Sequence, residues 1–292
     1  MPLELEHAAA VARALGLDEH GLHVEPLPGG DIADASLLRA ADATVFLKTL
    51  PLAQAGLLSA EADGLEALRQ TATVRVPRVI QRGMQDGFSW LALEYLDLDQ
   101  RNAGADERLG RQLANLHRHT GDEFGWHRNN YIGRTPQTNT RIDDWTVFFA
   151  AHRLGAQFDR LRRTHPDEGW QALKNEVIAS WQKVSAQHQP EPSLVHGDLW
   201  RGNAAVLADG TPVIFDPAVH YGDRECDLAM AHLFGGFDDA FYQAYNEAWP
   251  LPEGFEVRRF FYKLYHMLNH ANLFGGPYVE ASEQLCRRIL KE

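Results

Sequence analysis

The most informative part of the chain is Leu194-Val195-His196-Gly197-Asp198-Leu199-Trp200-Arg201-Gly202-Asn203, followed closely by Val213-Ile214-Phe215-Asp216-Pro217-Ala218. Each stretch begins with an apolar run that is typical of a short buried strand, and its polar residues come directly after that run. Asp198, Asn203 and Asp216 carry the hard oxygen ligands that Mg²⁺ prefers. A carboxylate can also accept a proton from a hydroxyl group within hydrogen-bond reach. Together the two stretches predict a magnesium site with a general base.

The spacing of these residues equals that of the catalytic loop of protein kinases. Asn203 lies five positions after Asp198, as in the pattern H-R-D-x-x-x-x-N, and Asp216 follows at the end of the next strand. In that loop the first aspartate accepts the proton of the substrate hydroxyl, and the asparagine and a later aspartate bind magnesium. The alternative is that Asp198 and Asn203 only cap a turn between strands, which explains the whole string less well.

A phosphotransferase also needs a cation for the nucleotide phosphates, and the first 173 residues contain only one lysine, Lys48. It lies in the apolar strand 45–50, where an unpaired ammonium group is costly. The following helix, predicted over 53–70, should therefore supply an acid. Glu61 shares the apolar face of that helix, whereas Glu66 faces outward, so we expect Glu61 to pair with Lys48. The alternative is that Lys48 extends into solvent at the end of its strand.

Hydrophobic periodicity changes along the chain. The first 96 residues contain predicted helices over 3–16 and 53–70 and strands over 22–27, 35–39, 44–50, 79–80 and 88–96. The chain after residue 96 is mostly helical. Its exceptions are a loop over 120–142 and a strand–loop–strand unit over 193–216. The predicted helices are 105–119, 143–163, 168–188, 238–248, 255–273 and 278–291, with a further one that begins at Glu225. We therefore predict two domains, 1–96 and 97–292.

Two further stretches are candidates for nucleotide binding by their position. Gly29-Gly30-Asp31 lies between the first two strands, where backbone N–H groups could contact phosphates, although an ordinary hairpin turn uses the same residues. Glu94-Tyr95-Leu96 ends the last strand of the first domain and would offer main-chain groups to adenine.

Composition excludes several classes of function. The 292 residues include 28 Lys and Arg against 40 Asp and Glu, and the net charge of −12 disfavours binding to nucleic acid or to an anionic membrane surface. No run is long and apolar enough to span a membrane. Two cysteines, Cys226 and Cys286, give no disulfide framework, so we expect a cytoplasmic protein.

Several motifs then resemble one family. They are His196-Gly197-Asp198-Leu199-Trp200-x-Gly202-Asn203, Asp216-Pro217-Ala218, Tyr221-Gly222-Asp223-Arg224-Glu225-x-Asp227-Leu228, Gly29-Gly30-Asp31-Ile32, Thr135-Pro136-Gln137-x-Asn139 and Trp145-x-x-Phe148-Phe149-x-x-x-Arg153. Spread in order over nearly the whole chain, these motifs are similar to those of the fructosamine (ketosamine) kinases, which are related to the aminoglycoside phosphotransferases. The resemblance implies a two-lobed, protein-kinase-like α+β fold, with a small antiparallel β-sheet lobe that contains one main helix and a larger, mostly helical lobe.

The resemblance also implies an activity and its machinery. An ATP- and Mg²⁺-dependent kinase of this family acts on the C3 hydroxyl of a ketosamine, a sugar–amine adduct that is free or carried on a glycated peptide or protein. Asp198 would then be the base, Asn203 and Asp216 the metal ligands, and Lys48 with Glu61 the phosphate-binding pair.

Four further roles follow from the same resemblance. Asp227 and His196 would support the catalytic loop structurally, Trp200 could stack on the sugar, and Asp223 could favour the amine of the substrate. Core packing is the alternative for Trp200. Asn129-Asn130-Tyr131 stands where many members have an acidic residue beside the asparagine.

Two other functions remain open. The same fold could phosphorylate another small hydroxyl compound, such as an aminoglycoside or a choline-like molecule, because a fold alone does not fix the substrate. A non-catalytic nucleotide-binding protein is the second alternative, although the complete set of Lys48, Asp198, Asn203 and Asp216 argues against it.

Overall fold

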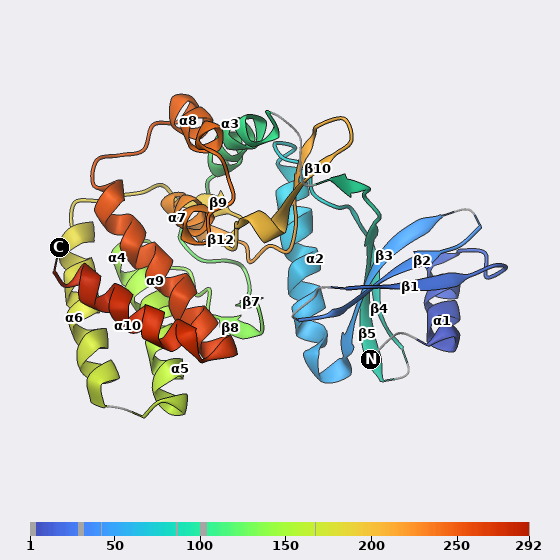
Figure 1. Ribbon diagram of the computed structural model, residues 1–292, viewed down its shortest axis with the longest axis horizontal. Helices are drawn as coiled ribbons and strands as arrows, with labels where there is room; N and C mark the ends of the chain where they lie inside the picture. The colour runs from blue at the N-terminus through green and yellow to red at the C-terminus, as the bar shows by residue number, and fades with distance from the viewer. Residues whose placement is uncertain are drawn as a thin grey trace. The chain divides into compact units, whose positions relative to one another are not determined.

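Strands dominate the first part of the chain and helices the rest (Figure 1). The computed structural model describes residues 4–28, 32–41, 43–85, 87–99, 104–166 and 168–291. The chain divides into two units. The first comprises residues 1–102 and 205–216, and the second comprises residues 103–204 and 217–292.

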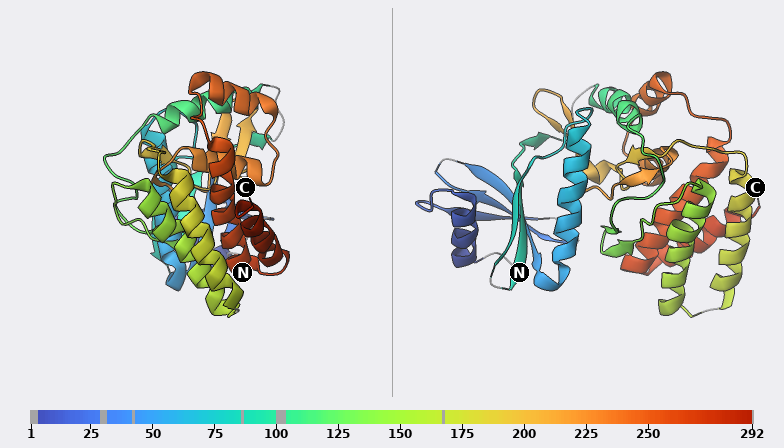
Figure 2. Two further views of the ribbon diagram at one scale, coloured as in Figure 1. Left: turned by 90° about the vertical axis from the view of Figure 1, so that its left-hand side faces the viewer. Right: turned by 180° about the vertical axis from the view of Figure 1, so that it is seen from behind.

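A five-stranded antiparallel sheet forms the centre of the first unit. Its strand order is β1-β2-β3-β5-β4, and the strands are β1 (His23–Leu27), β2 (Asp34–Arg39), β3 (Thr44–Pro51), β4 (Val79–Gln85) and β5 (Phe88–Glu94). Helices α1 (Leu5–Leu15) and α2 (Ala55–Gln70) lie on opposite faces of this sheet (Figures 1 and 2). A 3₁₀ turn, η1 (Leu52–Gln54), leads from β3 into α2.

Strand β3 shows why Lys48 faces α2. Val45 and Leu47 are buried in the cluster that includes Ala8 and Val11 of α1. Successive side chains of a strand point to opposite faces of the sheet, so Lys48 points to the other face, which α2 covers. The alternation of the sequence thus puts the only lysine of this unit's sheet beside the helix that carries Glu61.

A second, three-stranded sheet accounts for the residues 205–216 in the first unit. Its order is β11-β10-β6, with β6 (Leu98–Asp99), β10 (Ala204–Leu207) and β11 (Pro212–Ile214). Val206 pairs with Asp99, and the backbone N–H of Ile214 donates to Arg75 O at 3.0 Å. The units therefore differ from the predicted domains 1–96 and 97–292, because this hairpin makes its backbone bonds with β6 and with Arg75 of the first unit.

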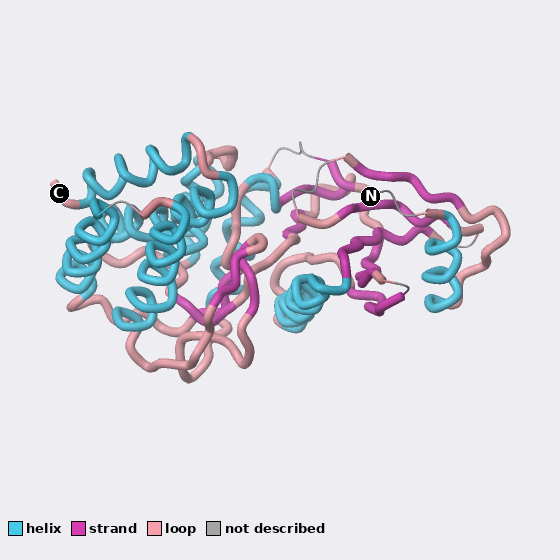
Figure 3. Tube along the Cα trace, turned by 90° about the horizontal axis from the view of Figure 1, so that it is seen from below, coloured by secondary structure: helices cyan, strands magenta, loops and turns pink. Residues whose placement is uncertain are grey.

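Helices form most of the second unit (Figure 3). They are α3 (Ala105–His117), α4 (Trp145–Phe149), α5 (Ala156–Thr164), α6 (Glu168–Ser185), α7 (Glu225–Leu233), α8 (Asp239–Ala248), α9 (Phe255–Phe274) and α10 (Pro277–Ile289). Helix α9 packs against α5, α6, α7 and α10. The core they enclose is rich in aromatic side chains, including Phe149, Phe158, Trp181, Phe261 and Tyr262. None of the helices among the described residues is long and apolar enough to cross a membrane.

Three short elements of the second unit were not expected from the sequence. The predicted loop 120–142 contains the hairpin β7 (Asn130–Ile132) and β8 (Thr135–Gln137), and β12 (His220–Gly222) pairs with β9 (Ser193–Val195). Three-residue strands are too short to show a period of two. The predicted helix 143–163 is interrupted by the π-helical segment η2 (Ala150–Gly155). There the buried Arg153 donates to Thr138 O and to Asn139 Oδ1, both at 2.8 Å.

We predict that Gly110→Ala destabilises the protein although alanine is the better helix former. A Cβ atom at Gly110 of α3 would lie 2.2 Å from Phe241 O and 3.1 Å from Tyr245 N, both backbone atoms of α8. The helices must therefore move apart, and we expect a loss of about 1–3 kcal/mol in the free energy of unfolding. Urea denaturation measures it.

Arg108→Ala, at an exposed position of the same helix, is the control and should change stability by less than about 0.5 kcal/mol. A Gly110→Ala variant more stable than the parent would show that α3 and α8 do not pack this closely.

Candidate active site

In the first unit Lys48 lies between two carboxylates. Its Nζ donates to Glu61 Oε1 at 2.7 Å, as predicted, and also contacts Asp216 Oδ1. Burial alone would lower the pKa of Lys48, but Asp216 and Glu61 together raise it above its ordinary value. The ammonium group therefore stays charged. Glu66 faces outward and pairs with Arg69, also as predicted.

Two acids share this one cation, which leaves the Lys48 cluster (Lys48, Glu61 and Asp216) with an excess of negative charge. Burial raises the pKa of Glu61 to about 7, and Asp216 adds to the rise while Lys48 opposes it. A divalent cation bound at Asp216 would offset this excess. The donor set of the cluster is thus compatible with a metal ion.

Asp216 follows β11 in an uncommon backbone conformation. Its φ of 56° lies in the left-handed region, and Ala72 is the other non-glycine residue with positive φ among those the structure describes. Aspartate tolerates this conformation better than most residues. Such conformations cluster at functional sites, where they direct a side chain that ordinary strand geometry would point elsewhere.

In the second unit the loop 196–203 brings Asp198 and Asn203 together. It begins where β9 ends, and its last three residues form the 3₁₀ turn η3 (Arg201–Asn203). Asn203 Nδ2 donates to Asp198 O at 2.9 Å and lies 3.4 Å from Asp198 Oδ2. With Nδ2 directed at Asp198, Oδ1 is the atom through which Asn203 would bind a metal. The Asp198 side chain is 22% exposed, so it can receive a ligand.

Asp227 holds the start of this loop, as the resemblance implies. Its Oδ2 accepts from His196 N at 2.7 Å, and its Oδ1 accepts from Gly197 N at 2.8 Å. A third bond comes from His117 Nε2 at 3.1 Å. The ring of the buried His196 contributes as well, because Asp198 N donates to its Nδ1 at 3.3 Å.

Gly197 is required by the same close packing. Its φ is +82°, and a Cβ atom would lie 2.2 Å from Ala218 O. The N–H of Ala218 in turn donates to His196 O at 2.8 Å. A side chain at position 197 would therefore separate the loop from the backbone beside it.

Trp200 lies at the surface of the second unit. Its side chain is 38% exposed, and its ring meets Phe234 edge-on at a centroid distance of 6.0 Å. The ring also covers Gly202, where a Cβ atom would lie 2.3 Å from it. Full burial in the core, the alternative for Trp200, is therefore not observed, and the ring offers a face for stacking.

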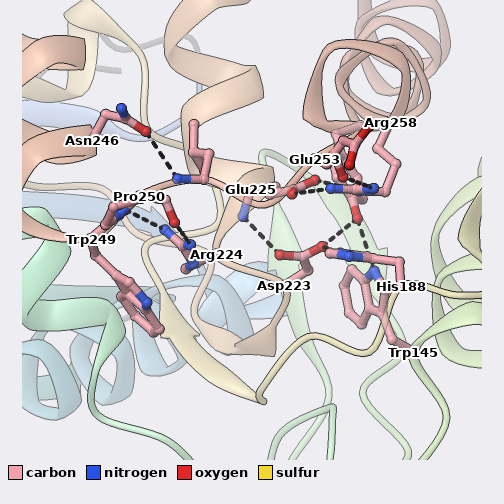
Figure 4. Close-up of polar contacts among 12 residues, drawn as sticks. Trp145, His188, Asp223, Arg224, Glu225, Asn246, Trp249, Pro250, Glu253 and Arg258 are labelled. Carbon is pink, nitrogen blue, oxygen red and sulfur yellow. Dashed lines mark hydrogen bonds and ion pairs between the residues drawn. The ribbon is translucent and has the colours of Figure 1, made fainter.

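Asp223 does not fit the expectation that it contacts the amine of the substrate. It is 1% exposed, and its Oδ2 binds His188 Nε2 at 2.6 Å (Figure 4). The same oxygen accepts from the Tyr262 hydroxyl at 2.5 Å. Its Oδ1 accepts from Glu225 N at 3.0 Å. Glu225 is itself paired with Arg258. We correct the expectation: Asp223 is an internal anchor of α7, because Oδ2 is bound by two groups from distant elements and Oδ1 by the backbone at the start of α7.

The candidate nucleotide-binding stretches are only partly described. Gly29, Gly30 and Asp31 lie outside the described residues. The carboxylate of Glu94 accepts from Arg75 Nη2 at 2.6 Å and from Arg78 N at 3.1 Å, and the Glu94 N–H donates to Arg78 O at 2.9 Å. Main-chain donors for adenine would therefore have to come from the residues that follow Glu94.

Three histidines near the site were missed by sequence reasoning. His117 supports Asp227, His188 binds Asp223, and Nδ1 of His266 lies 3.9 Å from Asp198 Oδ1. None belongs to a spacing pattern with its partner, because each contact joins residues far apart in the chain. His117 could have been expected to be buried, since it lies one turn after Leu113 on the apolar face of α3.

We predict that Asp227→Asn destabilises the protein by about 2–3 kcal/mol at pH 7, since a buried N–H of the loop loses its charged acceptor. Burial alone would raise the pKa of Asp227, but bonds from His117 and Gly197 hold it below its ordinary value. The stabilisation is therefore present above the pKa of an unfolded aspartate, about 4, and is lost as the pH falls through the lower folded value. Urea unfolding at pH 7 and pH 3 should show the difference narrowing.

Asp122→Asn is the matched control, because this aspartate is exposed in the same unit. A difference between the parent and Asp227→Asn that is the same at both pH values would contradict a charged Asp227.

Comparison with known proteins agrees with this geometry. Residues 6–292 match the family described as fructosamine kinase. A protein of Synechocystis named a probable ketoamine kinase is 44% identical over 264 residues, covering 90% of this chain and 88% of its own length. A solved structure from Thermobifida fusca, assigned as a candidate fructosamine-3-kinase, has a TM-score of 0.87 at 32% identity and covers 99% of this chain and 100% of its own.

More distant structures share the fold alone. A choline kinase from Streptococcus pneumoniae has a TM-score of 0.66 at 15% identity, and the match covers 98% of each chain. The kinase-like α+β fold implied by the motifs is thus the fold of this protein. With nearly the whole chain matched, the protein belongs to the fructosamine kinase family.

Proposed function

We propose that this protein transfers the γ-phosphoryl group of ATP to the C3 hydroxyl of ketosamines and thereby promotes deglycation. Its family establishes the coarser statement that it is a kinase-type phosphotransferase that acts on a small molecule. The observation that supports the finer proposal most is the loop 196–203, in which Asp198 and Asn203 have kinase spacing and are held together by hydrogen bonds.

Asp198 would act as the base. The acceptor oxygen forms a bond to the γ-phosphorus while the bond between that phosphorus and the bridging oxygen of ATP breaks, and ADP leaves. The hydroxyl proton passes to an oxygen of Asp198. Phosphoryl transfer depends mainly on positioning and electrostatics, so the rigid hold of Asp227 on the loop is part of this role.

Lys48 would bind the nucleotide phosphates, and Glu61 would orient it through the 2.7 Å bond. Because this pair is fixed before ATP binds, little reorganisation is required at the moment of transfer. Gly29, Gly30 and Asp31 would add backbone contacts to the phosphates, and the Glu94-Tyr95-Leu96 stretch would contact adenine.

Asn203 and Asp216 would hold Mg²⁺, since both offer hard oxygen ligands. When bound, the ion offsets charge on the phosphates. The excess negative charge of the Lys48 cluster supports this assignment independently of the sequence spacing.

The acceptor would be a sugar–amine adduct, either free or on a glycated peptide, with Trp200 stacking on its sugar. We assign the reaction to the cytoplasm, because both cysteines are buried free thiols, as a reducing compartment favours.

A panel of acceptors tests the proposed substrate class. We expect ADP release with fructoselysine or ribuloselysine, and not with kanamycin or choline, and mass spectrometry of the sugar amine should show one added phosphate. Turnover of kanamycin or choline alone would favour a different acceptor on the same fold. ATP binding without transfer to any of the four would favour a non-catalytic protein.

We predict that Asp198→Asn lowers kcat by about 10²–10⁴-fold, the usual contribution of a positioned base. The dissociation constant of ATP should change less than about threefold, because the carboxylate acts on the acceptor and asparagine preserves the shape of the side chain. Steady-state turnover and calorimetric titration with ATP measure the two quantities. Asp122→Asn serves as the control, and turnover of Asp198→Asn at the parental rate would contradict the assigned role.

A further inference from the structure

A buried ring nitrogen near Asp198 lacks a hydrogen-bond partner within the described part of the protein. His266 lies in α9 and is 3% exposed, and its Nδ1 has no hydrogen-bond partner among the described residues. That atom lies 3.9 Å from Asp198 Oδ1. Nearly all buried polar atoms in native proteins are hydrogen-bonded, so an orphaned ring nitrogen calls for an explanation.

The neighbours of His266 on α9 show what is unusual about it. Arg258, Tyr262 and His266 follow one another at intervals of four residues, which places them on one face of the helix. Arg258 binds Glu225 through two bonds of 2.6 and 2.8 Å, and Tyr262 donates to Asp223 at 2.5 Å. His266 is the third member of this polar stripe (Arg258, Tyr262 and His266), and it too faces an acid, but at a distance too long for a direct hydrogen bond.

The separation between His266 Nδ1 and Asp198 Oδ1 is compatible with one bridging oxygen. A separation of 3.9 Å is too long for a direct hydrogen bond. An oxygen placed off the line between the two atoms can, however, lie about 2.8 Å from both, which is an ordinary hydrogen-bond length. The oxygen that must approach Asp198 in the proposed reaction is the acceptor hydroxyl.

The imidazole is suited to donate to that oxygen. Burial, with a smaller contribution from His270, lowers the pKa of His266 to about 3, so the ring is neutral at physiological pH. A neutral imidazole has one N–H group and one acceptor nitrogen. An acceptor nitrogen facing the Asp198 carboxylate would be repelled, so the tautomer with its proton on Nδ1 fits this site.

We propose that His266 binds the acceptor hydroxyl: its Nδ1–H donates to the hydroxyl oxygen, and the hydroxyl's own proton points to Asp198. The oxygen retains a second lone pair for attack on phosphorus, and His266 neither gains nor loses a proton during transfer. The side chain thus fixes which hydroxyl of the substrate is presented to the base. This role rests on the proposed function and deepens it.

Three variants of His266 test the proposal. Asparagine places an amide nitrogen close to the position of Nδ1, glutamine moves the same group toward the position of Nε2, and leucine removes it. We expect His266→Leu and His266→Gln to lower kcat/KM for the ketosamine by about tenfold or more, the effect of one lost hydrogen bond to a buried group. His266→Asn should stay within about threefold of the parent. The KM for ATP should not change in any variant.

An analogue with hydrogen in place of the C3 hydroxyl separates contact from packing. It should inhibit the parent competitively, and its inhibition constant should change less than twofold in His266→Leu, because the group that His266 contacts is missing. If His266→Leu does not fold, His266→Asn and His266→Gln still decide the question, since both keep a polar side chain. The inhibition constant of the analogue is then measured for His266→Gln.

The outcomes are distinguishable from failure of the proposed function. If the parent protein phosphorylates the ketosamine and His266→Leu has the same kcat/KM as the parent, the role of His266 is overturned and the proposed function stands. Equal losses for the substrate and the analogue would also overturn it, because they indicate a structural role. Absence of ketosamine turnover in the parent protein would overturn the proposed function, and this inference with it.

Discussion

The charge of Asp227 is the constraint on which the loop 196–203 depends. A carboxylate buried this completely costs several kcal/mol unless donors surround it. Here two successive backbone N–H groups, those of His196 and Gly197, and the ring of His117 supply them. The same bonds that stabilise the anion fix the backbone on which Asp198 is presented. The position of Asp198, the proposed base, and part of the stability of the second unit thus depend on the same bonds.

The side chains proposed to bind ligands differ in charge between the two units. In the first unit, one ammonium group lies between two carboxylates, and the imbalance favours an additional cation. In the second unit, the carboxylate of Asp198 lies 3.9 Å from a neutral imidazole. The first arrangement agrees with the proposed metal-bound nucleotide, and the second, a donor near an acceptor, agrees with the proposed hydroxyl group. Each arrangement is in place without the ligand, which reduces the reorganisation needed during transfer.

The sequence could predict the contacts that arise within neighbouring elements. Alternation in β3 and the apolar face of α2 were sufficient to pair Lys48 with Glu61, because both periodicities are local. The membership of residues 205–216 in the first unit could not be read in this way, since it results from pairing with β6 and with Arg75. Asp223 was misjudged for the same reason. Its position near Asp227 suggested function, but its burial is decided by His188 and Tyr262.

Helix α9 shows most clearly that hydrophobic periodicity alone does not predict which side chains are buried. Arg258, Tyr262 and His266 form a polar stripe, and a polar stripe on a helix ordinarily marks the face exposed to solvent. All three side chains are buried, because two of the acids they face belong to the segment that begins α7 and the third belongs to the loop 196–203. Two of these pairs are hydrogen-bonded, whereas His266 Nδ1 and Asp198 Oδ1 are 3.9 Å apart. The position of His266 beside Asp198 therefore depends on packing between distant segments, which the sequence pattern of α9 does not show.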